Sequence, residues 1–374
     1  PLYRLKRMST DTERLPTFLK VSWGVGSVGT TSMLYLINMF LVFFLVRHVG
    51  IDAAVAGGLM AATRFYDAIV NPVIGTLSDH THSRWGRRRP WMLAGAILCP
   101  LGIIAVFNPP ATLSGAALTI FVMGALLLYL TAYSLYVIPY TALGTEMTDD
   151  YVERGSVMAY RTFFVYCSGI VVVSGAPALV AMLGKDRAAY STMSFAAAAI
   201  VGAALLWVVL FTGQARLTVR AKERLPLGLW WRTTISNVPF LIVLVTKMTL
   251  QLGTAFTGAA SLFFMTYVMQ RDENALAQYG FVANIMGVVS VPLWGKVLQK
   301  VERRPFFIAL LVVNALTYFS WLLASPDEPI AIFLFRAFVS GVAGAGSVLV
   351  AMAMLTDTIE YDRLTTGQRR EGLF

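Results

Sequence analysis

An acidic side chain stands inside an apolar stretch of the sequence, one helical turn from an amide and from an arginine. Asp67 lies within the run 53–77, with Arg64 three residues before it and Asn71 four residues after it. On a helix this spacing places the three side chains on one face. A charge at membrane depth costs several kcal/mol unless it is paired or functional. The spacing therefore predicts a functional polar site, and it leaves open a fixed Arg64–Asp67 ion pair that only braces helices.

The run around Asp67 is one of ten apolar runs in the 374 residues. A helix needs about 20 mainly apolar residues to cross a hydrocarbon core. Hydrophobic residues make up 57% of the chain and charged residues only 13%, which excludes a soluble enzyme. The sequence predicts an all-α membrane protein in contact with the lipid bilayer, with helices at 17–46, 53–77, 90–107, 113–143, 157–183, 188–212, 238–269, 276–297, 305–323 and 329–356.

Basic residues fall mainly on one side of the predicted membrane. The N-terminus and the segments on its side hold 21 Lys and Arg residues, and the other side holds four. By the positive-inside rule, the N-terminus is cytoplasmic and the protein lies in the cytoplasmic (inner) membrane. The net charge of +10 is then a topology signal, and we expect no nucleic-acid partner.

The longest polar connection divides the predicted helices into six and four. It spans 213–236, which predicts an N-terminal half at 1–212, a cytoplasmic linker at 213–236 and a C-terminal half at 237–374. A weak repeat crosses this boundary. Pro-x-x-Gly closes a helix and Arg-Arg-Pro opens the next one both in 71–90 and in 291–305.

These motifs resemble the glycoside-pentoside-hexuronide cation symporters, a melibiose permease-like family of the major facilitator superfamily. The resemblance rests on RFYDAIVNPVIG at 64–75, SRWGRRRPW at 83–91, IPYTAL at 138–143, Arg161, and DTIEYDRLTTGQRREG at 357–372. It implies a secondary active transporter, not an enzyme, whose halves rock around the substrate. Family members have twelve helices. We therefore expect a fragment with an open groove beside its last four helices, and an artefact in residues 1–7.

The resemblance assigns Asp67 to the coupling-cation site, where a second carboxylate often occupies the position of Asn71. Sodium prefers several oxygen ligands, which Asp67, the Asn71 amide and the Ser134 hydroxyl could supply. One carboxylate beside an amide also suits a proton carrier, because a buried carboxyl can take up and release a proton. We favour a proton over sodium. We expect no resident metal or cofactor, since neither the cysteines nor the histidines have metal-binding spacing.

The substrate contacts of the resembling family carry over less completely. Its melibiose-binding members hold sugar hydroxyls with two aspartates, and the matching positions here are Thr31 and Val137. A galactoside-type site is therefore not expected. Arg161 could bind a uronate carboxylate or reach a phosphate headgroup, and the aromatic residues could equally be packing residues. The side chains left near the expected cavity suit stacking on a sugar ring and bonding its hydroxyls; they are Trp23, Thr30, Thr31, Tyr133, Tyr140, Thr141 and Arg161.

Two more basic residues interrupt the later apolar runs. Lys247 lies about 15 Å along its helix by the usual rise, which makes it a candidate for substrate binding. Pairing or lipid-edge snorkelling are the alternatives. Arg336 lies nearer the outer surface, and we expect it to snorkel.

A charged stretch follows the second predicted helix. Asp79 and the arginines Arg87, Arg88 and Arg89 can form inter-helix ion pairs that latch one face shut. Purely topogenic charge explains the arginines equally well but does not explain Asp79.

Two classes of function remain. The first is symport of a sugar, glycoside or uronide, coupled to protons or sodium, by a monomer. The second is transport of a lysolipid-like or other amphipathic molecule. A polar aromatic pocket closed to lipid would favour the first, and a lateral apolar opening would favour the second.

Overall fold

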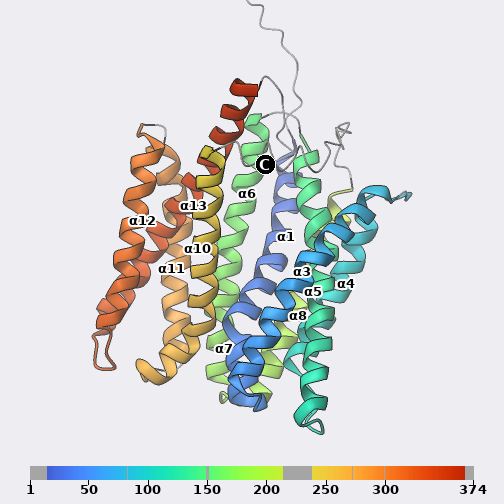
Figure 1. Cartoon of the computed structure of the whole chain (residues 1–374), viewed down its shortest axis with the longest axis vertical. Coiled ribbons are helices and arrows are strands. Elements are labelled where there is room, and N and C mark those ends of the chain that lie inside the picture. The colour runs from blue at the N-terminus through green and yellow to red at the C-terminus, as the bar shows by residue number, and fades with distance from the viewer. Residues whose placement is uncertain are drawn as a thin grey trace, which may run out of the picture.

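A computed structural model of the chain describes residues 15–81, 83–148, 151–213, 238–271, 273–298 and 300–366. Within these ranges every regular element is a helix, which confirms the prediction of an all-α protein. Figure 1 shows the long helices running side by side along the longest axis of the molecule. The start of α1 (Thr17–Tyr35) and the end of α13 (Ile330–Thr366) lie at the top of this view, which we call the upper end.

Nine helical stretches of the described residues are long and apolar enough to cross a membrane. The remaining predicted run forms α3 (Ala53–His80), whose 28 residues span about 42 Å at the usual rise. This helix is less apolar because it carries Arg64, Asp67 and Asp79. Each of the ten predicted runs therefore corresponds to a helix of membrane-spanning length.

The first six runs form a group that we call the α1–α8 group. Two of its rods contain π-helical segments, which widen the helix and are common at functional sites. The first rod joins α1, η1 (Leu36–Leu41), α2 (Val42–Phe44) and η2 (Leu45–Val49). The others are α3, α4 (Arg89–Phe107), α5 (Gly115–Glu146), the rod α6 (Tyr151–Gly169), η3 (Ile170–Gly175) and α7 (Ala176–Met182), and α8 (Arg187–Phe211).

The last four runs form the α10–α13 group. They are α10 (Val238–Phe263) with η4 (Phe264–Val268), α11 (Glu273–Val297), α12 (Arg303–Ser320) with η5 (Trp321–Leu323), and α13. The predicted linker at 213–236 lies almost wholly outside the described residues. Side chains beyond Met354 also lie outside them, so the resemblance at 357–372 is seen only as helical backbone up to Thr366.

Large side chains of the α1–α8 group form the main core. Trp23, Tyr136, Tyr140, Phe40 and Phe44 are all fully buried there. By contrast, α10 presents many apolar side chains to the outside, among them Ile242, Val245, Met248, Leu252 and Phe256. Such a surface is compatible with a lipid environment, in which exposed apolar residues carry no hydrophobic penalty.

The two groups touch along two pairs of rods. One pair is η1 and α2 against α10, where the rings of Phe43 and Phe263 meet edge to face with centroids 5.1 Å apart. The other pair is α6, η3 and α7 against α11. There a Cβ added at Gly169 would lie 1.9 Å from Asn284 Oδ1, and a Cβ added at Gly280 would lie 3.0 Å from the backbone carbonyl oxygen of Val173. The backbones of α11 and α13 are closer still, because a Cβ at Gly341 would lie 2.1 Å from the carbonyl oxygen of Ala283.

The expectation for Arg336 is wrong. Its side chain is buried, with residue exposure of only 7%, and its guanidinium binds both carboxylate oxygens of Glu328 at 2.6 and 2.8 Å. The guanidinium also donates to Ser320 and lies over the ring of Trp321. An acid in the short connection before α13 therefore removes the need for snorkelling.

Candidate functional site

Helix α3 positions the three side chains singled out by their spacing. Asp52 caps its start, accepting a hydrogen bond from the backbone N–H of Ala54 at 2.8 Å. Pro72 interrupts the helix directly after Asn71 and has no N–H to offer the preceding turn. The site therefore lies beside a turn of α3 that lacks one backbone N–H donor.

Two hydrogen bonds hold α3 against α5 at this level. The Ser134 hydroxyl donates to Asn71 Oδ1 at 2.7 Å, and Ser134 is fully buried. Farther along, the hydroxyls of Tyr66 and Thr131 lie 2.6 Å apart. The structure thus brings Asn71 and Ser134 together, as the predicted cation site requires.

Asp67 is the most unusual group in this region. Its Oδ1 atom is buried, and no described residue forms a hydrogen bond with it. No described cation lies within ion-pair distance of its carboxylate, and Arg64 instead donates from Nη2 to Asn38 Oδ1 at 3.2 Å. The bracing alternative required a fixed Arg64–Asp67 pair, which this conformation does not contain. A buried carboxylate oxygen without a partner is costly, and a bound proton or cation would remove that cost.

A second arginine reaches the same region from α6. Arg161 lies within electrostatic range of the Tyr133 hydroxyl of α5, as do Asp67 and Arg64 of α3. Helices α3, α5 and α6 therefore bring together a set of side chains that we call the polar cluster: Arg64, Asp67, Asn71, Tyr133, Ser134 and Arg161.

Three predicted substrate residues lie in the core instead. The indole of Trp23 stacks on the ring of Tyr140 with centroids 5.0 Å apart, and its Nε1 donates to the Tyr140 carbonyl at 3.2 Å. The Tyr140 hydroxyl donates in turn to the Trp23 carbonyl at 2.9 Å. Thr30 is 5% exposed and donates to the carbonyl of Gly26. In this conformation Trp23 and Tyr140 pack α1 against α5, and Thr30 is buried within α1.

The remaining predicted substrate residues are more accessible. Thr31 and Val137 are partly exposed, and so is Thr141, whose hydroxyl donates to the carbonyls of Val137 and Ile138 in its own helix. Lys247 is exposed on α10. Within the described part of the chain, no hydrogen bond or ion pair joins these side chains to the polar cluster, so they do not extend it in this conformation.

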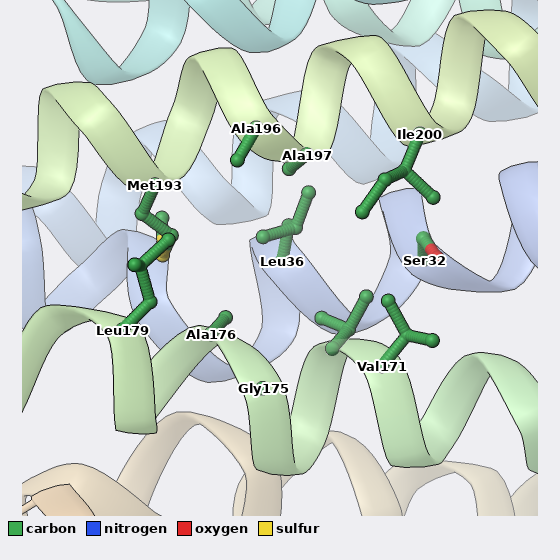
Figure 2. Close-up of a pocket in the computed structure, with 11 residues that line it drawn as sticks. Ser32, Leu36, Val171, Gly175, Ala176, Leu179, Met193, Ala196, Ala197 and Ile200 are labelled. Atoms are coloured by element: carbon green, nitrogen blue, oxygen red, sulfur yellow. The ribbon is translucent and has the colours of Figure 1, made fainter.

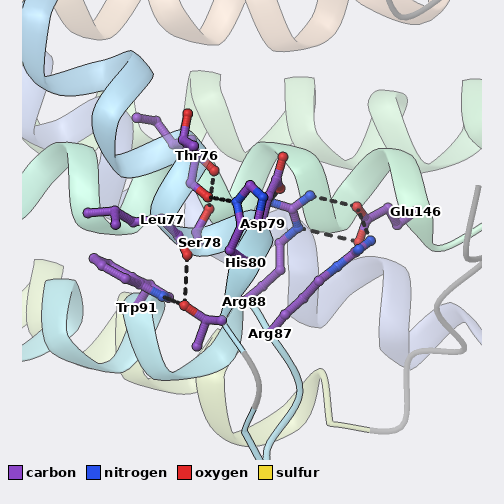
Figure 3. Close-up of polar contacts among 12 residues, drawn as sticks. Thr76, Leu77, Ser78, Asp79, His80, Arg87, Arg88, Trp91 and Glu146 are labelled. Atoms are coloured by element: carbon purple, nitrogen blue, oxygen red, sulfur yellow. Dashed lines mark hydrogen bonds and ion pairs between the residues drawn. The ribbon is translucent and has the colours of Figure 1, made fainter. Parts of the chain in front are cut away.

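The charged stretch after α3 forms an ion-pair network at the upper end, which Figure 3 shows. Arg88 is 4% exposed and binds Asp79 Oδ1 at 2.9 Å and Glu146 Oε1 at 2.7 Å. Arg87 binds Glu146 as well, also at 2.9 Å. Arg89 donates to the carbonyl of Val209 in α8. Asp79 and the arginines do join helices, but all of these helices belong to the α1–α8 group.

Sequence reasoning missed two members of these networks. Glu146 lies three residues beyond the predicted end of its helix, and an acid at that point facing the arginine cluster was the available signal. Asn38 lies in the apolar run 17–46, where a lone amide offered a similar signal.

A cavity of about 380 Å³ lies away from the polar cluster, between the first rod, η3 with α7, and α8. Figure 2 shows its apolar walls, which include Leu36, Val171, Leu179, Met193 and Ile200, with Ser32 as the polar exception. Several wall residues, such as Val171 and Ile200, are exposed on the outer face of the group. The cavity therefore opens sideways and is not a polar pocket between the two groups.

These features define an all-helical, multi-pass membrane protein with an ionisable cluster among its helices. The model of the family described as MFS/sugar transport protein matches residues 22–374. The chain belongs to this family and has the major facilitator superfamily fold. This finding confirms the resemblance that the motifs indicated.

Individual relatives are similar over almost the whole chain. An uncharacterized symporter, YnaJ, of Bacillus subtilis is 25% identical over 98% of this chain and 79% of its own length. The putative glycoside/cation symporter YagG of Escherichia coli is 26% identical over 95% and 76%. The isoprimeverose transporter of Lactiplantibacillus pentosus is 26% identical over 96% and 75%. The crystal structure of a D-xylose-proton symporter is similar in fold, with a TM-score of 0.56, 13% identity, and coverage of 92% of this chain and 86% of that one.

Proposed function

We propose that this protein is a secondary active transporter that couples the inward movement of a cation to uptake of a sugar, glycoside or uronide. The observation that carries the proposal is the buried Oδ1 of Asp67, which receives no hydrogen bond from any described residue although Asn71, Ser134 and Arg64 are nearby. A cation gradient can drive uphill uptake only if cation binding biases the conformational cycle that moves the substrate. Asp67 is the group that would bind the cation and thereby bias the conformational cycle.

The coupling cation is a proton in preference to sodium. Asp67 is the carboxylate of the polar cluster, and Asn71 Oδ1 already accepts a hydrogen bond from Ser134. A sodium ion would need both of these oxygens and further ligands, whereas a proton needs only the free carboxylate oxygen. Sodium bound at Asp67, Asn71 and Ser134 is the alternative that the transport assay distinguishes.

The substrate class follows from the relatives and from Arg161. One relative is named a glycoside/cation symporter, another an isoprimeverose transporter, and a third a glucuronide carrier protein homolog. A guanidinium suits a uronate carboxylate because it can donate two parallel hydrogen bonds to it. Tyr133 and Arg161 together offer hydroxyl and charged donors to an oxygen-rich ligand.

Transport proceeds by alternating access, with the halves at 1–212 and 237–374 moving relative to each other around the site. The α1–α8 and α10–α13 groups meet in two separate pairs of rods, as rocking halves would require. The distribution of basic residues supports an N-terminus in the cytoplasm, which places the upper end on the cytoplasmic side. The ion pairs of Asp79, Arg87, Arg88 and Glu146 would then brace the cytoplasmic end of the α1–α8 group as it moves, and the protein acts as a monomer in the inner membrane.

Transport by purified protein in liposomes tests this proposal. We expect substrate added outside to cause external alkalinisation in the absence of sodium, because protons enter with it. Sodium coupling would instead give sodium-dependent uptake without that alkalinisation. Absence of uphill uptake with either gradient, across sugars, glycosides and uronides, would contradict the proposal.

The lateral cavity favours a second candidate, transport of a lysolipid-like molecule. Its apolar walls and sideways opening would accept an acyl chain better than a sugar. A ligand that binds only the folded state raises the apparent stability of a protein. A thermal-shift comparison of sugars, uronides and lysolipids therefore separates the candidates. In the Arg161→Gln variant, uronides should no longer stabilise the protein, whereas the effects of sugars and lysolipids should be unchanged.

A further inference from the structure

We propose that Asn38 is a positioning residue that connects the cation site at Asp67 with the contact between the two helix groups. The inference rests on the proposed symport function. It adds a mechanism by which cation binding at Asp67 changes the contact between the α1–α8 and α10–α13 groups. Two contacts of Asn38 carry it, one through its side chain and the other through its backbone and Cβ.

The side-chain contact joins Asn38 to the polar cluster. Its Oδ1 accepts the hydrogen bond from Arg64 Nη2 at 3.2 Å. Arg64 lies one turn before Asp67 on α3, and its positive charge acts on the Asp67 carboxylate. A guanidinium carries five N–H donors in a rigid plane, so its orientation depends on which acceptors attract it. In this conformation the Arg64 hydrogen bond goes to Asn38, while no described residue bonds Asp67 Oδ1, so Asn38 and Asp67 are two acceptors that attract one arginine.

The second contact joins Asn38 to the other group. A Cβ built on Gly258 of α10 would lie 3.3 Å from the carbonyl oxygen of Asn38 and 3.5 Å from its Cβ. The absence of a side chain at Gly258 thus allows η1 to lie directly against α10. About one turn farther along both rods, Phe43 and Phe263 continue the contact.

Asn38 also lies in a part of the first rod that differs from an ordinary α-helix. It belongs to η1, and η1 makes more of the contact with α10 than its neighbour α2 does. A π-helical segment has one more residue per turn than the α-helix on either side of it, and such segments are frequent at functional sites. A shift of the Asn38 side chain therefore acts on a segment whose geometry already departs from the regular helix.

These contacts give the cation a mechanical effect. An ionised Asp67 attracts the Arg64 guanidinium away from Asn38. Once a proton or sodium ion neutralises the carboxylate, Arg64 keeps its bond to Asn38 and holds η1 in position against α10. The conformation described here contains both the Arg64–Asn38 bond and the η1–α10 contact. Cation binding would thereby favour one arrangement of the two groups.

Transport by Asn38→Ala in liposomes tests the connection. We expect cation-driven accumulation to fall at least tenfold, while exchange of substrate across membranes without a gradient stays within about threefold of the unmodified protein. Asn38→Asp should keep Arg64 permanently engaged and make uptake less dependent on the cation. The matched control is Asn314→Ala, which removes a partly buried amide that joins α12 to Ser347 of α13, far from the polar cluster. It should preserve coupling.

A second readout follows the contact itself. In a background without Cys99 and Cys167, the pair Phe43→Cys and Phe263→Cys can be joined by a short bifunctional thiol reagent. Cation should change the cross-linking yield in the otherwise unmodified protein, and the change should disappear with Asn38→Ala. Because this measurement does not need net transport, it distinguishes a lost connection from a poorly active variant.

These experiments distinguish a failure of the Asn38 inference from a failure of the proposed symport function. If the unmodified protein accumulates substrate with a cation gradient and Asn38→Ala does so equally well, the inference is overturned and the symport function stands. Equal loss of accumulation and exchange in Asn38→Ala, with an unchanged cation effect on cross-linking, would also overturn it. If the unmodified protein shows no cation-driven accumulation, the proposed function itself has failed.

Discussion

The two arginines that bind Glu146 should contribute very different amounts to stability. Arg88 is 4% exposed and bridges Glu146 and Asp79, whereas the Arg87 side chain is 32% exposed and has Glu146 as its one ion-pair partner among the described residues. Double-mutant cycles with Arg88→Gln, Arg87→Gln and Glu146→Gln measure each pair separately.

The exposures set the expected magnitudes. Hydrogen bonds to charged groups contribute about 1.5–3 kcal/mol when shielded from water, so the Arg88–Glu146 coupling energy should fall in that range. A solvent-exposed ion pair is worth about 0–1 kcal/mol, and the partly exposed Arg87–Glu146 pair should lie near the upper end of that range. Only the Arg87 pair should weaken strongly with added salt, because buried pairs are poorly screened.

Equilibrium unfolding in mixed detergent micelles, followed by tryptophan fluorescence, gives the free energies of unfolding for the cycles. Arg161→Gln serves as a control for loss of an arginine outside the network. Equal coupling energies for the two pairs, or equal sensitivity to salt, would refute the argument that burial of Arg88 decides the strength of this network.

Three further predictions concern the site and the core. Asp67→Asn should fold, exchange substrate downhill and fail to accumulate it, as measured in liposomes; full accumulation would show that this acid is structural. Val137→Asp should not improve transport of the native substrate but should admit a galactoside when Thr31→Asp accompanies it, and galactoside uptake by the unmodified protein at comparable rates would contradict this. Trp23→Ala should lower the free energy of unfolding by about 3–5 kcal/mol through loss of buried packing. The milder Trp23→Phe should leave the substrate KM unchanged, whereas a large rise in KM would return Trp23 to the binding site.

The sequence was most informative where hydrophobicity alone decides the structure. All ten apolar runs correspond to helices, although several extend farther than predicted, as α13 does by reaching Thr366. Polar residues near a helix end can continue the backbone hydrogen bonding, so loss of hydrophobicity does not mark where a helix stops. The same effect hid Glu146, which is the last residue of α5.

Side-chain partners were harder to predict because they depend on packing between helices. Spacing placed Arg64 and Asp67 on one face, which made an ion pair between them plausible. The long Arg64 side chain instead reaches from α3 to the amide of Asn38 in η1, and no pattern within α3 contains that information. Likewise, Trp23 and Tyr140 are suitable residues for sugar binding in isolation, but their mutual hydrogen bonds place them in the core.

The position of α11 between α6 and α13 limits what this protein can change over evolutionary time. The residues of closest approach are neighbours in sequence, with Ala283 against Gly341 and Asn284 against Gly169. A methyl group added at Gly341 would lie 2.1 Å from the carbonyl oxygen of Ala283 and 2.9 Å from two more of its backbone atoms, which cannot rotate away. A methyl group added at Gly169 would first meet the amide of Asn284, a side chain that can turn aside. Substrate preference can therefore diversify through the polar cluster, whereas a new residue at Gly341 would have to displace α11 from α13. Random mutagenesis should recover small residues at Gly169 but almost no functional variants at Gly341.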